Sequence, residues 1–240
     1  MKLHQVPDEH LGEVAADLVA EAFAERPALS LTTPTGSTPI PLYRELRRRH
    51  LRGKLDWSAA RVFMLDEYVD LPGYPERSFA AFLAEHLGPL LEEATVHRLD
   101  PATDAADPAR YDRALDAAGG LDLAIVGVGR NGHVGFNEPG ALDSTRTHVV
   151  RLAPETLEDN FPGEGPSTRP TRAVTLGLSD LRAARSVLML VAGAAKGPVL
   201  ATLFEGRRVE DVPATHLLGG DLTVVATESA LTAACRHAAL

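Results

Sequence analysis

The chain has 240 residues, of which 45% are hydrophobic and 24% are charged, and its formal net charge is -9. These values are typical of one large globular domain or two small ones with enough apolar residues for a sizeable core. The negative charge and the lack of a basic stripe argue against a nucleic-acid partner. An anionic ligand would therefore need a local positive site.

The N-terminal segment is charged early and has no apolar core of signal-peptide length. No stretch of the chain approaches the ~18 apolar residues of a membrane span. The single cysteine, Cys235, cannot form an internal disulfide, which favours a reducing compartment. Its Ala-rich surroundings favour a buried or inert thiol over a catalytic one. We therefore expect a cytoplasmic protein with no membrane partner.

Short apolar runs alternate with helical patterns along the chain. Strands are predicted, in chain order, at residues 28–33, 61–65, 121–126, 173–176, 186–191 and 222–226. Helices are predicted at residues 40–52, 111–118, 195–205 and 228–238. This alternation indicates βαβ units. We expect a single α/β domain over residues 1–240, with a Rossmann-like, mostly parallel sheet, helices on both faces, and a ligand beyond the carboxyl ends of the strands.

Residues 160–172, NFPGEGPSTRPTR, break the regular pattern with three prolines and two glycines. Such a segment is either a plain surface connection or a mobile lid over a site. We mark residues 155–172 as a candidate lid.

Small hydroxyl residues follow the first predicted strand, in the sequence PTGSTP at residues 34–39. A helix is predicted directly afterwards, so free N–H groups and the positive end of the helix dipole would face this loop. Thr35, Gly36, Ser37 and Thr38 would then form a phosphate cradle. The plainer interpretation is a Ser/Thr helix cap. The segment is not a P-loop, because no Gly-Lys-Ser/Thr follows it.

Two carboxylates, Asp66 and Glu67, stand at the end of the second predicted strand. Adjacent side chains of an extended chain point in opposite directions, so at most one of the two faces a ligand. A partly desolvated carboxylate at this edge is suited to act as a general base. A helix cap or an ion pair is the alternative.

The third predicted strand runs into GVGRNGHVGFNEP, residues 127–139. Its glycines match the dinucleotide-binding motif G-x-G-x-x-G, but two observations disfavour dinucleotide binding. The loop is a poor helix start, and residues 147–152 lack the acidic residue that the motif requires about 20 residues after its glycines. The glycines instead allow a tight loop that presents Asn131, His133 and Glu138. A histidine beside a carboxylate moves protons near neutral pH, although a lone loop histidine is usually structural.

Lys196 is one of only three lysines, the others being Lys2 and Lys54. It follows the predicted strand at residues 186–191, where a compact positive charge would suit a phosphate group. A chance surface lysine is the alternative.

Together these segments resemble the glucosamine-6-phosphate deaminase family and, more distantly, the 6-phosphogluconolactonases that share its fold. The deaminase pattern comprises Pro-Thr-Gly-x-Thr-Pro, Asp-Glu-Tyr, Gly-x-Gly-x-Asn/Asp-Gly-His-x-x-Phe-Asn-Glu-Pro and Gly-x-x-Lys. All four motifs occur here in order, and the resemblance extends over about residues 31–215. The deaminase branch is favoured, because lactonases usually lack Phe-Asn-Glu-Pro and carry Asp-Glu-Arg.

The resemblance implies a small-molecule sugar phosphate as substrate, and aldose–ketose isomerisation followed by loss of ammonia, with no metal and no organic cofactor. It implies that Asp66 shuttles a proton between C2 and C1. His133 would assist ring opening, oriented by Asn131 and Glu138. Residues 35–38 and Lys196 would hold the 6-phosphate. Assembly into a homo-oligomer is left open by the sequence.

Two departures from the family pattern concern the substrate. The lid motif Asn-x-Arg-Phe becomes Asn160-Phe161, so its phosphate-binding arginine is missing, and Arg169 and Arg172 are candidates to replace it. The family's Ser-x-Leu-Gln-x-His becomes THLLGG at residues 215–220. Three alternatives therefore stay open: water elimination from an N-acetylated sugar phosphate by the same acid/base set, a 6-phosphogluconolactonase, and a sugar-phosphate sensor without turnover. The acid/base set argues against the sensor.

Overall fold

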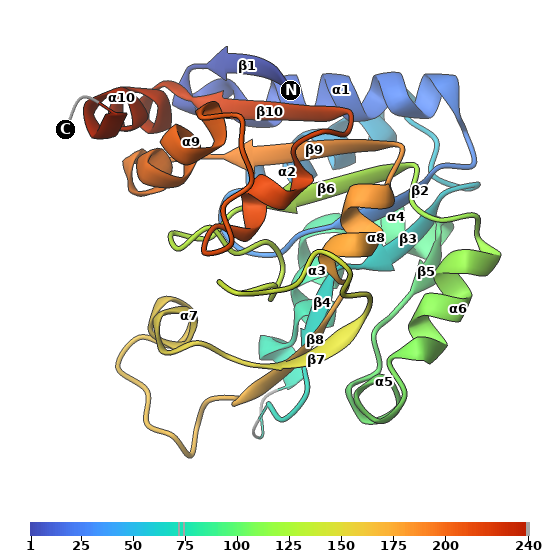
Figure 1. Ribbon diagram of the computed structural model, residues 1–240. Helices are drawn as coiled ribbons and strands as arrows, with labels where there is room; N and C mark the ends of the chain where they lie inside the picture. The colour runs from blue at the N-terminus through green and yellow to red at the C-terminus, as the bar shows by residue number, and fades with distance from the viewer. Residues whose placement is uncertain (72, 74, 239–240) are drawn as a thin grey trace.

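Seven strands form the main sheet of the computed structural model, which describes residues 1–71, 73 and 75–238 (Figure 1). Their order across the sheet is β1-β10-β9-β6-β2-β3-β5, and each pairing between neighbours is parallel. The strands are β1 Lys2–Val6, β2 Ser30–Thr33, β3 Arg61–Met64, β5 Thr95–His97, β6 Leu123–Gly127, β9 Ser186–Val191 and β10 Leu222–Thr227. The expected α/β fold with a mostly parallel sheet is confirmed.

Helices cover both faces of this sheet, as predicted. They are α1 Leu11–Glu25, α2 Ile40–Leu51, α3 Phe79–Leu87, α4 Pro89–Glu93, α5 Pro101–Ala106, α6 Ala109–Ala117, α7 Pro154–Asn160, α8 Leu178–Ala183, α9 Gly197–Phe204 and α10 Glu228–Ala238. Short 3-10 turns are η1 Asp8–His10, η2 Pro75–Arg77, η3 Ala194–Lys196 and η4 Pro213–Leu217. Each of these helices is too short or too polar to span a bilayer.

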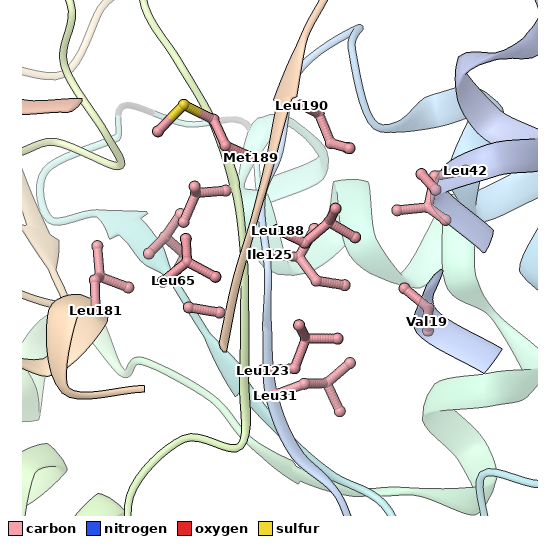
Figure 2. Close-up of a cluster of buried hydrophobic side chains, with 14 of the residues drawn as sticks. Val19, Leu31, Leu42, Leu65, Leu123, Ile125, Leu181, Leu188, Met189 and Leu190 are labelled. Atoms are coloured by element: carbon pink, nitrogen blue, oxygen red, sulfur yellow. The ribbon is translucent and has the colours of Figure 1, made fainter. Parts of the chain in front are cut away.

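The core lies on both sides of the central strands. In Figure 2, Leu188 and Leu190 of β9 point toward the face that carries Leu42 of α2. Met189 points the opposite way, toward the face where Leu181 of α8 lies. Successive side chains of a strand alternate between faces, and both faces here are covered, so β9 is almost continuously apolar. This explains why an unbroken apolar run predicted the strand correctly.

The strand order reverses direction between β6 and β2. From β2 the chain proceeds through α2 to β3 on one side, whereas from β6 it continues to β9 and β10 on the other side. The segments that leave the carboxyl ends of β2 and β6 therefore diverge. Ligands of open α/β sheets bind in the crevice at such a point. The two glycine-containing segments singled out in the sequence, residues 34–39 and 127–139, both start here.

A second, antiparallel sheet of three strands stands beside the main sheet, in the order β4-β8-β7 (Figure 1). Its strands are β4 Asp66–Tyr68, β7 His148–Arg151 and β8 Arg172–Thr175. The predicted placement of residues 173–176 with the parallel strands is thus wrong. A four-residue apolar run marks a buried strand, but it does not identify the partner or its direction.

Some elements were not expected from the sequence. The edge strands β1 and β5 and the long helix α1 lie outside the predicted set. Most residues of β1 are exposed or half-buried and polar, so no apolar run marks it. The expectation of a buried or inert thiol at Cys235 is wrong as to burial, because the thiol on α10 is exposed. That the thiol is inert stays a prediction.

Candidate active site

Four neighbouring strands of the main sheet, β9, β6, β2 and β3, deliver their following segments to one cavity of about 340 Å³. Thr35, Gly36, Ser37 and Thr38 line it after β2, and Asp66 lines it after β3. The loop after β6 contributes His133 among others, and the turn after β9 contributes Lys196. The structure therefore brings together residues that are up to 161 positions apart in the chain from Thr35 to Lys196.

Most of the segment at residues 34–39 lines the cavity. Helix α2 begins at Ile40, and its N-cap residue, Pro39, provides no side-chain cap. The hydroxyls of Ser37 and Thr38 thus line the cavity instead of closing the helix, and the helix-cap interpretation is wrong. Gly36 has a φ of 95°, a conformation that glycine adopts freely. This segment has the donors and the helix start that a phosphate group requires.

Asp66 and Glu67 point to different surroundings, as the alternation of an extended chain predicted. Glu67 accepts hydrogen bonds from the backbone N–H groups of Phe79 (3.0 Å) and Ala80 (2.8 Å), and so holds the start of α3. Asp66 is 5% exposed and lines the cavity. Its Oδ1 atom makes no hydrogen bond within the described part of the chain. Burial raises the pKa of Asp66 well above its ordinary value, and the charge of Glu67 raises it further. A carboxylate in this setting is a stronger base than usual.

Two glycines give the loop after β6 its shape. A Cβ atom on Gly129 would lie 2.3 Å from the Nδ1 and Cε1 atoms of His133, so the imidazole ring occupies space that any other residue would fill. A Cβ atom on Gly135, which has a φ of 56°, would lie 2.7 Å from Oγ1 of Thr175 and 3.4 Å from Oδ2 of Asp66. The glycines therefore serve close packing around His133 and Asp66. In the described residues the next helix after β6 is α7, so the loop does not open a helix as a dinucleotide motif would.

Asn131 and Glu138 do not line the cavity but are arranged around His133. The Asn131 amide donates to Oε2 of Glu138 (3.0 Å), and its carbonyl oxygen accepts from the backbone N–H of His133 (3.1 Å). The hydroxyl of Thr156 donates to Oε1 of Glu138 (2.5 Å). Nδ1 of His133 lies 3.6 Å from Oε2 of Glu138, which is an ion-pair distance rather than a hydrogen bond.

Electrostatics keep Glu138 ionised. Burial acts to raise its pKa, but the neighbouring His133, the Thr156 hydroxyl and the Asn131 amide outweigh that effect, and the pKa is lowered. The pKa values of the two carboxyl groups are thus shifted in opposite directions: that of Glu138, behind His133, is lowered, and that of Asp66, in the cavity wall, is raised. Groups whose environments push their pKa values apart are suited to acid and base roles.

Lys196 ends η3 at the N-cap of α9 and is half-buried in the cavity wall. Burial lowers the pKa of Lys196. The carboxylate of Asp159 opposes this effect, and the guanidinium of Arg130 adds to it. Lys196 is therefore no chance surface residue, but one of several charged groups gathered at this end of the cavity.

Helix α7, which falls almost entirely within the candidate lid at residues 155–172, contributes residues to which the sequence patterns assign no individual role. Asp159 and Asn160 line the cavity, and Thr156 bonds Glu138. The amide of Asn160 also donates to the hydroxyl of Tyr68 (3.1 Å). Residues three and four positions apart lie on one face of a helix, and Pro154 is well suited to a first turn, so a helix prediction at residues 154–160 would have grouped them.

The two candidates for the missing lid arginine do not reach the cavity. Neither Arg169 nor Arg172 lines it. Arg172 instead pairs with Asp70, with 3.7 Å between Nε and Oδ2, where β8 begins. Their proposed substitution for that arginine is wrong.

Fold and site define a doubly wound α/β protein whose cavity at the carboxyl edge of the sheet is lined by a buried carboxylate, a histidine, a lysine and a hydroxyl-rich loop. The family of glucosamine-6-phosphate isomerases and 6-phosphogluconolactonases matches residues 8–225, and the chain belongs to that family. A glucosamine-6-phosphate deaminase of Geobacillus sp. (strain WCH70) is 36% identical over 96% of this chain and 95% of its own length. The solved structure of a monomeric glucosamine-6-phosphate deaminase matches with a TM-score of 0.87 and 31% identity, over 97% of this chain and 100% of that one. A 6-phosphogluconolactonase from Trypanosoma cruzi shares the fold, with a TM-score of 0.77 and 20% identity over 96% of each chain.

Proposed function

We propose that this chain is a glucosamine-6-phosphate deaminase, which converts its substrate and water to fructose 6-phosphate and ammonia. The observation that carries the proposal is the shared cavity: Asp66 and His133 line it together with residues 35–38 and Lys196. Proton-transfer groups lie beside an anion site in one cavity, as the isomerisation of a sugar phosphate requires.

The sugar ring opens first. His133 takes the proton from the C1 hydroxyl and delivers it to the ring oxygen as the C1–O5 bond breaks. Glu138 stabilises the imidazolium that forms in between, since its Oε2 atom lies 3.6 Å from Nδ1 of His133. Asn131 and Thr156 position Glu138 through their hydrogen bonds to its two oxygens.

The isomerisation follows on the open chain. Asp66 removes the proton from C2, the electron pair forms the C1–C2 double bond, and the C1 carbonyl oxygen takes a proton from the substrate's ammonium group, which gives an enol amine. The carboxyl group of Asp66 returns its proton to C1, and the nitrogen lone pair forms an iminium double bond at C2. Water adds to this carbon, one of its protons moves to the nitrogen, and the C2–N bond breaks to give ammonia and the ketose. A buried carboxylate with a raised pKa is a suitable base for this step.

We assign the 6-phosphate to the part of the cavity lined by residues 35–38 and Lys196, the phosphate end. The hydroxyls and backbone N–H groups of residues 35–38 would donate to its oxygens, and Lys196 would supply a positive charge. The chain as a whole carries a net charge of -9, which would repel a phosphate group, and these residues supply the local positive site that such a group needs.

The deaminase assignment is supported against the alternatives by the similarity to deaminases at 31% and 36% identity over almost the whole chain. The lactonase similarity at 20% identity reaches only the fold. A sensor would need the anion site but not the Asp66 and His133 pair. No feature of the cavity favours elimination of water from an N-acetylated substrate.

The test is to incubate the protein separately with glucosamine 6-phosphate, its N-acetyl form and 6-phosphogluconolactone. We expect ammonia and fructose 6-phosphate, in equal amounts, from the first substrate alone. An unsaturated product from the N-acetyl form, or acid release from the lactone as the main activity, would replace the proposed function. Binding without any product would favour the sensor.

A further inference from the structure

A carboxylate stands among the charged groups at the phosphate end of the cavity. Asp159, in the last turn of α7, lines the same cavity as Lys196 and residues 35–38. Its charge acts on Lys196, as does that of Arg130. An anion in the wall of an anion site opposes ligand binding, so its presence calls for an explanation.

Asp159 forms an ion pair with Arg130 of the loop after β6. Nε of Arg130 lies 3.0 Å from Oδ2 of Asp159, and Nη2 contacts Oδ1, so both carboxylate oxygens are engaged. The side chains of Arg130 and Asp159 are 54% and 34% exposed, so the pair is open to solvent, and its Asp159 member lines the cavity. The fork of an arginine binds two oxygens of a phosphate in the same geometry as two oxygens of a carboxylate.

We propose that Arg130 is the second cation of the phosphate site, and that Asp159 is an internal competitor that holds Arg130 in the empty protein and yields it to the incoming phosphate. This inference rests on the proposed function, because it concerns how that function's substrate is bound. Arg130 would then supply from the loop what the family takes from an arginine of the lid. None of Arg130, Arg169 and Arg172 lines the cavity itself, but Arg130 is bonded to Asp159, which does, whereas Arg172 pairs with Asp70.

The exchange of Asp159 for phosphate as the partner of Arg130 links phosphate binding to helix α7. The Arg130–Asp159 pair joins α7 to the loop of His133. When phosphate takes Arg130, this link is broken, while Thr156 still ties α7 to Glu138 and Asn160 still bonds Tyr68. A phosphate group must therefore displace a carboxylate, and sugars without one gain nothing from Arg130.

The test is calorimetric binding of glucitol 6-phosphate, which resembles the open-chain sugar phosphate but cannot react, with glucitol as its unphosphorylated counterpart. We expect Arg130→Ala to raise the Kd for glucitol 6-phosphate roughly tenfold. Asp159→Asn removes the competitor and keeps the shape, and should lower the Kd about two- to fivefold. In the Arg130→Ala background, Asp159→Asn should give a smaller gain, because Arg130 is no longer there to be released.

Arg113→Ala is the matched control, since it removes a similarly exposed ion pair, with Asp107, on a helix that does not line the cavity. It should leave the Kd unchanged. The proposal is overturned if Arg130→Ala behaves like this control, or if Asp159→Asn weakens binding, which would make Asp159 a direct sugar ligand. Failure of wild-type protein to bind glucitol 6-phosphate would overturn both the inference and the phosphate site. Normal binding changes in a protein that releases no ammonia would overturn only the proposed function.

Discussion

Nδ1 of His133 lies 3.6 Å from Oε2 of Glu138, and Glu138 is itself held by Asn131 and Thr156. The carboxylate is therefore fixed in place before any substrate arrives. With Nδ1 directed to Glu138, Nε2 is left to exchange protons with the sugar. The relationship makes Glu138 a positioning and charge-stabilising residue that acts through His133.

Replacing that charge tests the relationship directly. Glu138→Gln keeps the shape but removes the negative charge that stabilises the imidazolium, and we expect kcat to fall roughly 10²-fold, at the lower end of the contribution of general acid–base catalysis. KM should change little, because Glu138 does not line the cavity. Thr156→Val, which loses only one hydrogen bond to Glu138, should lower kcat by a smaller factor. Steady-state kinetics on glucosamine 6-phosphate measure both; an equal effect of the two variants would argue against a role for the charge.

Gly129→Ala should displace the imidazole, because the new methyl group would sit 2.3 Å from ring atoms of His133. We expect a loss of activity of about 10²-fold or more, since proton transfer depends on the position of the ring. Gly165→Ala is the matched control: a Cβ atom there meets no atom within 4 Å, and it should leave activity and Tm near wild type. Full activity of Gly129→Ala would show that the ring position is not required.

The acidic limb of the profile of kcat/KM against pH should follow the ionisation of Asp66. The base works only when ionised, so kcat/KM falls as the pH drops through its pKa. Burial first, and the charge of Glu67 second, raise that pKa above the ordinary value of 3.8. The midpoint of the acidic limb should therefore lie well above 3.8. A limb at or below that value, measured as kcat/KM against pH, would contradict a buried general base.

The same raised pKa predicts a stability effect. A carboxyl group whose pKa is higher in the folded state costs no stability while it is protonated in both states, and destabilises the fold as the pH rises past its unfolded value. Asp66→Asn should thus be more stable than wild type at neutral pH, by on the order of 1 kcal/mol or more. The difference should shrink toward acid pH. Tm measured across pH tests this, and a less stable variant at neutral pH would indicate a structural Asp66.

Lys196→Ala should act mainly on binding. The loss of a charged partner for phosphate costs about 1.5–3 kcal/mol, which raises KM by roughly 10- to 100-fold. The value of kcat should change far less, because Lys196 belongs to the phosphate end of the cavity. Lys54→Ala, at an exposed position, serves as the control. An unchanged KM in Lys196→Ala would remove this residue from the phosphate site.

Much of the site was predictable because it rests on local rules. The alternation of an extended chain assigned different roles to Asp66 and Glu67, and the structure shows them facing the cavity and the start of α3. The glycines of residues 127–139 indicated close packing, and Gly129 shows its cause, an imidazole ring against its Cα. The position of Lys196 after a buried strand placed it at the carboxyl edge of the sheet, where it lies.

The rest depends on tertiary pairing, which short patterns do not encode. Residues 173–176 are as apolar as a parallel strand, yet β8 pairs antiparallel with β4 and β7. Arg130 lies within the motif at residues 127–139, whose glycines and histidine carry the sequence prediction, and nothing in the motif itself indicates a role for the arginine. Its partner Asp159 lies 29 residues away, so only the folded chain shows the pair.

The central claim is that Asp66 removes the proton from C2. Its most direct test is the rate of ammonia and fructose 6-phosphate formation from glucosamine 6-phosphate by Asp66→Asn, with binding of glucitol 6-phosphate measured in the same preparation. We predict a fall in kcat of at least about 10²-fold, with the Kd for glucitol 6-phosphate within a few-fold of wild type. Turnover by Asp66→Asn within a few-fold of wild type would contradict the account.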